Sequence, residues 1–511
     1  MEWPIDRERL LRVGSGTPRY ERIAAAFEEA IISGRLRAGA RLPTVRQLSL
    51  ELGVGSATVA AAYKLLTIQG WIRGEVGRGT FVATLPRTNP DRDQIARAGT
   101  PAVSHLGRLT TRLATPWRRR TLYGSTTRLR NTYPALMDCT SGRPDTSLLP
   151  LAALQRAWHA AIDATDYGDL QYAGPDPIQA LAQVLVPRLT MDNIRVRESD
   201  LVIGSSAQQL MGLALAVTAT LFRRTPLIVA VEEPGYQTVY DTFERAGYRL
   251  VGIEVDEQGA VPASLDAALR AGAHAVLFTP RVHNPTGASW TVDRVATLAD
   301  VLAAHPDVVA IEDDHLADLA TARAGSLVND RRIDERVVYI RSFAKTIAPD
   351  LRMAVAVARP HLRAMLAEAK SFADGWSSRL VQQALANILA DGELPQVLAT
   401  ARSAYADRRA AALKILAAQL SPAGGMASGS DGINIWVHLP PGADALEVIE
   451  QAAALGVLAA PGEPFFIRPG HSDVVRLSIG QVNAAQAATA AAVLAQTALT
   501  TVSIVPVAIS V

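Results

Sequence analysis

With 511 residues, 49% of them hydrophobic and 20% charged, the chain is expected to fold into more than one compact domain with a large core. Its most hydrophobic stretch near the middle, residues 210–221, is shorter than a bilayer crossing requires, and residues 1–10 lack the apolar run of a secretory signal. Cys139 is the only cysteine, which excludes an internal disulfide and favours a reducing compartment. We therefore expect a cytoplasmic protein with no membrane partner.

The net charge of +2 hides an uneven distribution along the chain. Residues 1–84 hold twelve Lys and Arg against eight Asp and Glu, and residues 85–131 hold ten Arg against two Asp. These two segments together carry a charge of about +12, so the remainder carries about −10. The asymmetry predicts an N-terminal part that faces nucleic acid, the alternative being an ordinary solvated surface.

Helix and strand signals follow one another closely before residue 84. We expect three helices and then two short strands, at 20–32, 45–52, 57–69, 71–73 and 77–82. Thr44 and Ser56 are suitable N-cap residues for the second and third helices. This order of elements predicts a winged helix-turn-helix domain (α+β) over residues 1–84.

Four residues of this domain are candidates for DNA contact. The second helix of a helix-turn-helix enters the major groove, and a wing reaches the flanking backbone or minor groove. Arg46, at the start of the supporting helix, suits a phosphate, whereas Ser56 and Thr58 open the recognition helix and Arg78 lies at the tip of the wing. We expect a double-stranded DNA operator as partner, with a winged helix used for protein contacts as the alternative.

The same segment resembles the GntR type of winged helix over about residues 17–83. The resemblance rests on Arg-Leu-Pro-Thr-Val-Arg at 41–46, Leu-Gly-Val at 52–54, Gly-Trp at 70–71 and Gly-Thr-Phe-Val at 79–82. That family usually places an arginine near the start of the recognition helix to read a base, and this chain has Ser56 there. The operator sequence therefore does not carry over from the resemblance.

Residues 85–134 are rich in Arg, Thr and Pro with weak periodicity, and we expect a linker that reaches roughly 40 Å when flexible. Beyond it, short apolar runs alternate with Ala- and Leu-rich helical segments up to about residue 500. This alternation predicts an α/β domain over 135–500, whose parallel sheet, in a large subdomain of about 180–395, has helices on both faces. An apolar tail, 501–511, ends the chain.

Lys345 is the best placed of the four lysines for cofactor chemistry. It follows the predicted strand 337–340 in a polar turn, and ligands of open α/β sheets bind at strand carboxyl ends. Lys64 belongs to the winged helix, while Lys370 and Lys414 lie in Ala-rich helical segments typical of a solvated face. Pyridoxal 5′-phosphate (PLP) requires an amine for a Schiff base, a carboxylate for its ring nitrogen and donors for its phosphate.

Other predicted strands also end in polar residues. Three acids, 312–314, follow an apolar run. Burying their charges at the end of a strand is costly unless a cation such as a protonated pyridine lies there. The alternative is that these acids cap a helix. Asn284 begins a turn with Pro285 and can bond a ring hydroxyl. Residues 204–208 join a predicted strand to the start of a helix, which suits a phosphate. Tyr236 follows another predicted strand and can stack on a ring. The alternative is that Tyr236 is an aromatic residue of the core.

Together these elements resemble the fold type I PLP-dependent aminotransferases over about residues 138–480 and, with the winged helix, the MocR subfamily of GntR regulators. The resemblance assigns the Schiff base to Lys345, the pyridine nitrogen to Asp313 and the ring hydroxyl to Asn284. A tyrosine that reaches the partner subunit's phosphate matches Tyr172, and an arginine that binds a substrate carboxylate matches Arg476. The cofactor phosphate is assigned to Ser206, Ala207, Gln208, Ser342 and Arg352.

Two positions depart from the subfamily pattern. A tyrosine that usually follows the pyridine aspartate by two residues, as a second contact to the ring hydroxyl, is His315, and the serine before the lysine is Ala344. Both changes affect catalysis more than cofactor binding. We therefore predict a homodimeric transcription regulator whose aminotransferase-like domain senses PLP or a small amino compound. The alternative is an active aminotransferase that carries a DNA-binding module.

Overall fold

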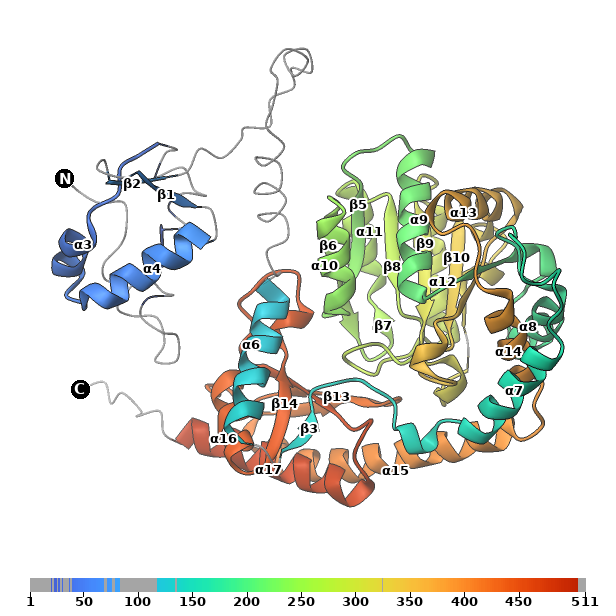
Figure 1. Cartoon of the computed structure of the whole chain (residues 1–511). Helices are drawn as coiled ribbons and strands as arrows, with labels where there is room; N and C mark the ends of the chain where they lie inside the picture. Colours follow the sequence, from blue (N-terminus) through green and yellow to red (C-terminus); the bar gives the residue numbers. More distant parts are fainter. Residues whose placement is uncertain are drawn as a thin grey trace, which may run out of the picture. The chain divides into compact units, whose positions relative to one another are not determined.

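The chain divides into two compact units, Met1–Thr115 and Pro116–Val511. The computed structural model describes residues 20, 23–24, 26–27, 30, 36, 39–68, 71–75, 79–82, 117–133, 136–323 and 325–503 (Figure 1). No helix in these ranges is both long and apolar enough to cross a membrane.

The N-terminal unit has the winged-helix elements that the sequence predicts. Helix α3 (Val45–Leu52) begins after Thr44, whose side chain accepts from the Gln47 amide while the Gln47 side chain bonds back to Thr44. It ends at Gly53, whose φ of 64° a residue with a side chain rarely adopts. Helix α4 (Ser56–Ile68) and the antiparallel strands β1 (Ile72–Glu75) and β2 (Gly79–Val82) follow.

Two expectations for this unit are modified. Helix α4 begins at Ser56 itself, because the carbonyl of Gly55 already accepts from the Thr58 amide, so Ser56 is the first helical residue and not the N-cap. The helix expected at 20–32 lies only partly within the described residues. Among the described residues of this segment, Phe27 is fully buried and packs edge-to-face on Tyr63 of α4, with ring centroids 5.9 Å apart.

The C-terminal unit is built on an eight-stranded sheet of order β4-β11-β10-β9-β8-β5-β6-β7. Its strands are β4 (Leu201–Gly204), β5 (Ile228–Glu233), β6 (Arg249–Asp256), β7 (Gly259–Ala260), β8 (Ala275–Phe278), β9 (Val309–Asp314), β10 (Val337–Ser342) and β11 (Ala354–Val357). Strands β4, β10, β9, β8, β5 and β6 run in one direction, and β11 and β7 run against them. The α/β fold expected for this part of the chain is confirmed, and the sheet departs from the expected parallel arrangement only at β11 and β7.

Helices cover both faces of this sheet, as Figure 1 shows. One face packs on α9 (Ala207–Leu221), α10 (Gln237–Arg245) and α13 (Pro360–Ala373). The other packs on α7 (Leu151–Asp163), α8 (Gln179–Met191), α11 (Pro262–Arg270), α12 (Val292–Ala303) and α14 (Arg379–Leu389). Successive residues of a strand alternate between the two hydrophobic clusters: in β9, Val309 and Ile311 belong to the first and Ala310 to the second.

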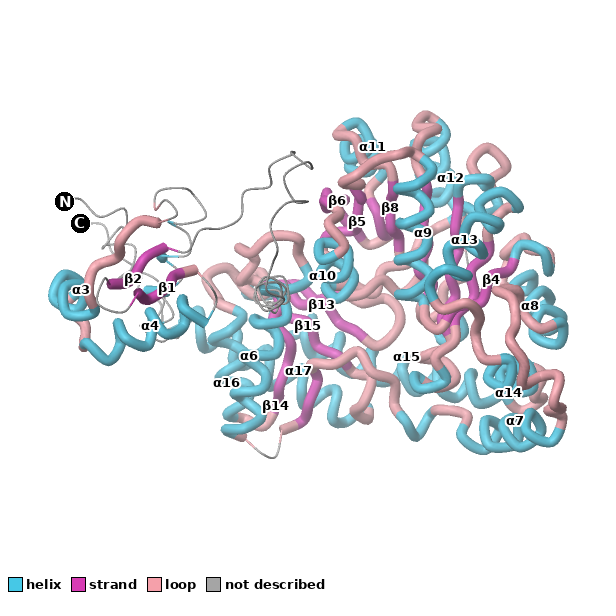
Figure 2. The backbone as a smooth tube through the Cα atoms, turned by 45° about the horizontal axis from the view of Figure 1, so that its top comes forward, coloured by secondary structure: helices cyan, strands magenta, loops and turns pink. Residues whose placement is uncertain are grey.

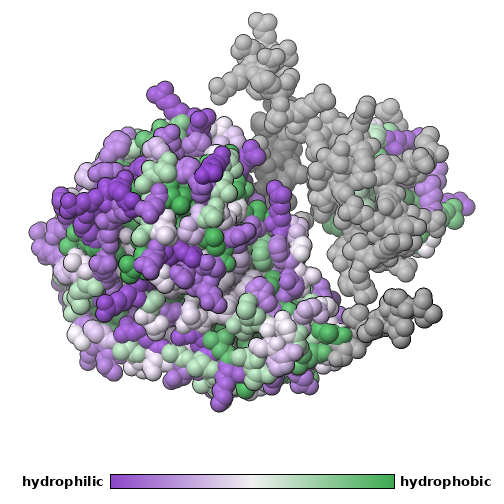
Figure 3. Space-filling view, turned by 180° about the vertical axis from the view of Figure 1, so that it is seen from behind, coloured by the Kyte–Doolittle hydropathy of each residue, from purple (hydrophilic) through white to green (hydrophobic). Residues whose placement is uncertain are grey.

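A second sheet of order β12-β13-β15-β14-β3 completes the unit (Figure 2). Its strands are β3 (Met137–Cys139), β12 (Met426–Ser428), β13 (Asn434–His438), β14 (Val457–Pro461) and β15 (Val474–Ser478). They pack on α6 (Trp117–Thr132), α15 (Leu394–Leu420), α16 (Ala445–Ala454) and α17 (Ala484–Ser503). Cys139 is buried in this sheet as a free thiol. Seen from behind, the surface is mostly hydrophilic with scattered hydrophobic residues (Figure 3).

Helix α6 lies inside the segment 85–134 that the sequence suggests as a linker. Its Leu122 and Leu129 are buried, Leu129 in the hydrophobic cluster of the second sheet, so this part of the segment belongs to the C-terminal unit. Residues 83–116 lie outside the described residues. Of the expected apolar tail, residues 501–503 continue α17, and 504–511 lie outside the described residues.

The two lysines expected on solvated helix faces differ in their surroundings. Lys414 in α15 is exposed, as expected. Lys370 in α13 is fully buried, so the expectation for it is wrong. Its Nζ donates to Asp374, one helical turn further along, at 2.8 Å. This ion pair makes the burial of the ammonium group tolerable.

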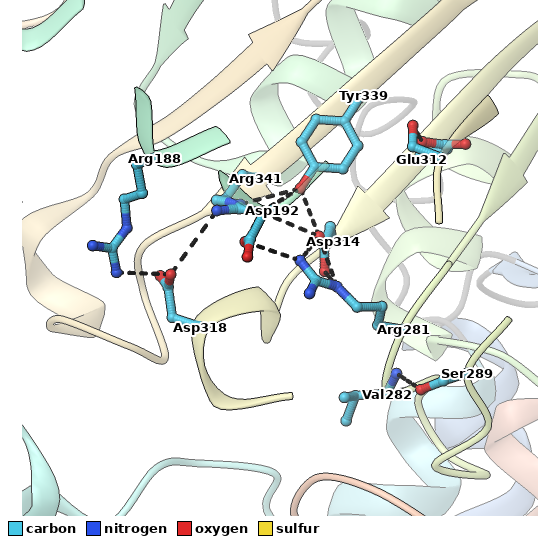
Figure 4. A network of polar contacts seen from close by, with 11 residues as sticks. Arg188, Asp192, Arg281, Val282, Ser289, Glu312, Asp314, Asp318, Tyr339 and Arg341 are labelled. Atoms are coloured by element: carbon cyan, nitrogen blue, oxygen red, sulfur yellow. Dashed lines mark hydrogen bonds and ion pairs between the residues drawn. The ribbon is translucent and has the colours of Figure 1, made fainter. Parts of the chain in front are cut away.

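A buried network of charges ties the ends of β9 and β10 to their surroundings (Figure 4). The Asp314 carboxylate accepts from Arg281 Nη2 and from the Tyr339 hydroxyl, each at 2.6 Å. Arg341, whose side chain is fully buried, donates to the Tyr339 hydroxyl at 2.9 Å and to Asp192 at 2.6 Å. Arg188 and Asp318 extend the network with a 2.8 Å ion pair. Three arginines therefore meet three aspartates, and the charge is balanced.

This network makes the first testable prediction. Replacing Arg341 by alanine leaves Asp192 and Asp314 short of a buried cation, so the free energy of unfolding falls by about 3–5 kcal/mol. Arg332→Ala is the matched control, because Arg332 pairs with Asp300 and Asp330 at the exposed surface and its loss changes little. Urea unfolding of the full chain, followed by circular dichroism, measures both. Equal midpoints for the two variants would contradict this role of Arg341.

Candidate functional site

The groups expected to bind a cofactor lie at the carboxyl ends of the parallel strands of the main sheet. Ser342, the last residue of β10, pairs with Ala354 of β11, which in turn pairs with Gly204, the last residue of β4. Asp313 near the end of β9 pairs with Ile340 of β10. The edge formed by these strand ends is where open α/β sheets bind ligands.

Asp313 and Lys345 form the centre of the site. Burial raises the pKa of Asp313 to about 7, although the positive charge of Lys345 opposes this rise. Burial lowers the pKa of Lys345 to about 8, against the effect of the Asp313 charge. Asp313 Oδ1 is buried without a hydrogen-bond partner in the described part of the chain. The pair thus combines an amine that is neutral at mildly alkaline pH with a carboxylate oxygen that lacks a donor.

Alternation along β9 explains why Asp313 differs from the acids beside it. Glu312 and Asp314 lie on the face of Ala310, where protein donors satisfy them: Glu312 accepts from the Ser326 hydroxyl and from the Leu327 amide at 2.7 Å. Asp313 lies on the opposite face, near Lys345. The strand continues through all three acids and does not end before them, because these partners make their burial tolerable.

Asn284 is brought together with Arg476, which comes from β15 of the second sheet. Arg476 Nη1 donates to Asn284 Oδ1 at 3.1 Å, and its Nη2 donates to the Thr140 carbonyl. The guanidinium carbon lies 4.6 Å from the centre of the Phe465 ring, and only 3% of Arg476 is exposed. The two sheets therefore meet at this pair, and Arg476 is held in a fixed orientation.

The turn that presents Asn284 is strongly constrained. Val282 has a φ of 52°, a conformation that costs a β-branched residue about 1–3 kcal/mol, and its amide donates to Ser289 Oγ at 2.9 Å (Figure 4). Gly287 also has a positive φ, and a Cβ there would lie 2.8 Å from the backbone of Gly429. These contacts hold Asn284 in one position.

Three of the residues expected at a phosphate lie at the start of α9. Ser206 is the N-cap of α9, and its hydroxyl accepts from the Gln209 amide at 3.1 Å; Ala207 is the first helical residue. The side chain of Gln208 extends away to Thr242 Oγ1 of α10, at 3.0 Å. Arg352 has a φ of 52°, is exposed and forms no hydrogen bond or ion pair within the described part of the chain. The helix N-terminus and this cation suit an anion.

The remaining expected residues differ in how close they lie to this centre. Burial and the charges of Lys345 and His283 hold the pKa of His315 well below its usual value, so its ring is neutral. Tyr236 precedes the first residue of α10 and is 41% exposed. Tyr172, 88% exposed, packs edge-to-face on Trp376 with ring centroids 5.4 Å apart, and no contact joins it to the other site residues in the described chain.

Sequence reasoning missed two further residues of this site. Glu232 in β5 is buried, accepts from the Thr279 amide at 2.7 Å and lies 3.5 Å from His283 Nε2. Burial raises the pKa of Glu232 to about 8, with a contribution from the Asp313 charge, and lowers the pKa of His283 to about 3. Both are therefore neutral at pH 7. An acid inside an apolar strand was the available signal for Glu232.

Of the four residues expected at DNA, three are described. Arg46 and Ser56 are exposed, at the starts of α3 and α4, and Thr58 is half-buried. Arg78 lies outside the described residues. The apolar side of α4, including Val59 and Leu66, fills the core of its unit, so its polar start faces outward.

Comparisons with known proteins match both units. Residues 19–82 match the bacterial regulatory proteins of the gntR family, and residues 136–494 match aminotransferase class I and II. The chain is 30% identical over 474 residues to the vitamin B6 salvage pathway transcriptional repressor PtsJ of Salmonella typhimurium, a match that covers 91% of this chain and 95% of PtsJ. It is 28% identical to the HTH-type transcriptional regulator TauR of Rhodobacter capsulatus, over 91% of this chain and 93% of TauR.

Solved structures with the same fold are aminotransferases. The multiple substrate aminotransferase of Thermococcus profundus matches with a TM-score of 0.69 at 22% identity, over 79% of this chain and 100% of its own. LysN, an α-aminoadipate aminotransferase of Thermus thermophilus, matches with a TM-score of 0.64 at 24% identity, over 77% of this chain and 99% of its own. At these identities the match establishes the fold.

Winged helix and aminotransferase fold in one chain define a class of DNA-binding transcription regulators. The chain belongs to the MocR subfamily of the GntR-type regulators. The family and the regulatory function that the sequence predicts are both confirmed.

The environment of Lys345 predicts how its reactivity depends on pH. Formaldehyde with cyanoborohydride methylates only neutral amines, so labelling of Lys345 should be half-maximal near pH 8. In Asp313→Asn that midpoint moves to lower pH, because the carboxylate that raises the pKa of Lys345 is gone. Mass spectrometry of the Lys345 peptide measures both, with exposed Lys414 as the reference in the same sample. A midpoint that is unchanged or higher in the variant would be evidence against the pairing.

Proposed function

We propose that this chain is a PLP-dependent transcription regulator in which the aminotransferase-like unit binds PLP through Lys345. The observation that carries the proposal is the buried pair of Lys345 and Asp313, with Asp313 Oδ1 left without a donor by the described residues. When bound, PLP supplies an aldehyde that condenses with primary amines and a ring nitrogen that draws electrons from the product. A protonated ring nitrogen is the donor that Asp313 lacks.

The other residues supply what the rest of PLP requires. Asn284, fixed by its constrained turn, bonds the ring hydroxyl, and the buried, neutral ring of His315 is close enough to Lys345 to feel its charge. Tyr236 at the edge of α10 stacks on the ring. The phosphate is held by the N-terminus of α9 together with the side chains and amides of Ser206, Ala207, Gln208, Ser342 and Arg352.

Arg476 determines the class of effector. Its planar, always charged guanidinium matches a carboxylate, and Phe465 and Asn284 fix its plane. Arg476 would hold the carboxylate of a bound effector, and PLP would supply the aldehyde that reacts with its amine. The effector is therefore PLP itself or a small amino compound that carries a carboxylate.

A second copy of the chain completes the cofactor site. The loop between α7 and α8 exposes Tyr167 to 91%, Tyr172 to 88% and Leu170 to 67%, and Leu151 and Phe372 add further apolar surface. Such exposure in a folded unit indicates a protein interface. In a homodimer, Tyr172 reaches the phosphate of the partner subunit. Two winged helices then bind the two halves of one operator.

DNA binding is assigned to the start of the winged helix. Arg46 contacts a phosphate, Ser56 and Thr58 face bases in the major groove, and Arg78 contacts the DNA flanking the wing. PLP and its amino ligand alter operator affinity by binding one dimer arrangement better than another. Because Ser56 is short and uncharged, discrimination between bases is weaker than an arginine provides.

Lys345→Ala separates the two activities. The variant gives no absorbance change with PLP, because no amine at the site remains to condense with the aldehyde, yet it binds DNA selected from the genome with the affinity of the unliganded wild type. Lys414→Ala is the control, because Lys414 is an exposed lysine of α15 outside the site. Spectrophotometry and electrophoretic mobility report the two activities.

Three outcomes would count against the proposal. An unaltered PLP spectrum in Lys345→Ala would remove the lysine assignment. Loss of DNA binding in that variant would show that Lys345 supports the fold and not the effector response. Rapid turnover of amino donors by the wild type, with no effect of PLP or donor on DNA binding, would favour an enzyme.

A further inference from the structure

Arg118, the second residue of α6, is a buried charge that the cofactor site does not use. Its side chain is fully buried although it lies among the arginines of an otherwise polar segment. Nη1 donates to Glu244 at 2.6 Å and to Asp241 at 3.3 Å, and Nε donates to the Phe466 carbonyl at 2.9 Å. The guanidinium carbon lies 5.2 Å from the centre of the Tyr240 ring. Its partners belong to α10 and to the segment after η9 (Glu463–Phe465).

Helix α10 links Arg118 to the cofactor side of the site. Tyr236 immediately precedes α10, and the Tyr240 hydroxyl of the same helix donates to the Glu232 carbonyl near the end of β5. Further along the helix, Thr242 bonds the Gln208 side chain in the first turn of α9. Arg118 thus holds α10 through two carboxylates, and α10 is in turn bonded to α9, the helix whose N-terminus is assigned to the phosphate.

The segment after η9 links Arg118 to the effector side. The Phe465 carbonyl accepts from the Gly235 amide at 2.8 Å, and the Ile467 amide donates to Glu233 at 2.6 Å. The Phe465 ring also supports Arg476. Because Arg118 bonds the carbonyls of Phe466 and Ile467, one guanidinium holds both this segment and α10.

Simple packing of α6 does not require a charge at this position. Leu122 and Leu129 already bury the apolar side of the helix. A buried arginine with two carboxylates has a large desolvation cost, and an apolar residue of similar size often serves stability as well or better. What the planar fork adds is directional bonding to several groups at once. Its partners define a specific geometry between α6, α10 and the segment after η9.

We propose that Arg118 is a positioning residue that couples the cofactor and effector site to the stretch of chain leading to the DNA-binding unit. Helix α6 begins at Trp117, directly after residues 83–116, which follow the last strand of the winged helix in the sequence. PLP and the effector, bound at Tyr236, the start of α9 and Arg476, fix the positions of α10 and Phe465. Arg118 transmits that ordering to the first turns of α6. The inference rests on the proposed function, since PLP must bind for the coupling to act.

Hydrogen exchange of the full chain with and without PLP tests this coupling. In the wild type, PLP slows exchange of the amides at the start of α9, in α10 and in the first turns of α6. In Arg118→Lys, which keeps the charge but not the fork, the slowing in α6 is lost while that in α9 remains, and the Kd for PLP rises by about fivefold. Arg128→Lys in the same helix, whose partner Glu450 is exposed, behaves as the wild type.

The outcomes separate the two proposals. No PLP absorbance change in the wild type would overturn the proposed function, and the inference with it. Normal PLP binding with equal slowing of α6 in wild type and Arg118→Lys would overturn the inference alone. If Arg118→Lys does not fold, Glu244→Gln replaces it, because the Glu244 side chain is 42% exposed and the change is mild. That variant is expected to reduce the slowing in α6, and an unchanged pattern would overturn the inference.

Discussion

The chemistry of this protein depends on a carboxylate and an amine that the chain buries together at one edge of a sheet. A charge on either Asp313 or Lys345 is costly in this buried place. Burial therefore raises the pKa of Asp313 and lowers the pKa of Lys345, which favours the neutral form of each. The pair is tolerable in the fold because each group stabilises the charge of the other. It also leaves Asp313 Oδ1 without a donor from the described chain, and we propose that the protonated ring nitrogen of PLP supplies this donor.

The surrounding structure holds this pair in place from several directions. On the opposite face of the sheet, Arg341, Asp314 and Tyr339 fix the ends of β9 and β10. From the second sheet, Arg476 reaches Asn284, so that the two sheets share one site. The chain thus has both the fold of an aminotransferase and a network of polar residues inside it. In the function that we propose, this site serves ligand binding and response in a chain that also carries a winged helix.

Features set by neighbouring residues could be predicted from the sequence. The capping of α3 by Thr44, the left-handed Gly53 and the strand before Lys345 depend on a few residues each. Lys345 stood out because the other three lysines lie within helices and not after a strand. The three acids at the end of β9 stood out as a group, and only the family resemblance selected Asp313 among them; nothing in the neighbouring sequence indicated the partners of the other two.

Features set by distant residues could not be predicted. Arg118 looked like one arginine of a linker, since its partners Asp241, Glu244 and Phe466 lie more than a hundred residues away and only the fold brings them together. Glu232 and His283 were missed for the same reason: their pairing requires β5 and the turn after β8 to lie side by side. The one-residue difference at the start of α4 reflects a backbone hydrogen bond from Thr58 to Gly55 that side-chain preferences do not reveal.

In the function that we propose, one site binds PLP and its occupancy changes DNA binding. The most direct test is a single titration of the full chain with PLP, read by absorbance and by fluorescence anisotropy of a bound DNA fragment in the same samples. We expect both signals to change with the same midpoint and the DNA affinity to shift by about 5- to 150-fold, the usual range of allosteric coupling. Saturation of the absorbance signal with no change in DNA affinity would contradict it.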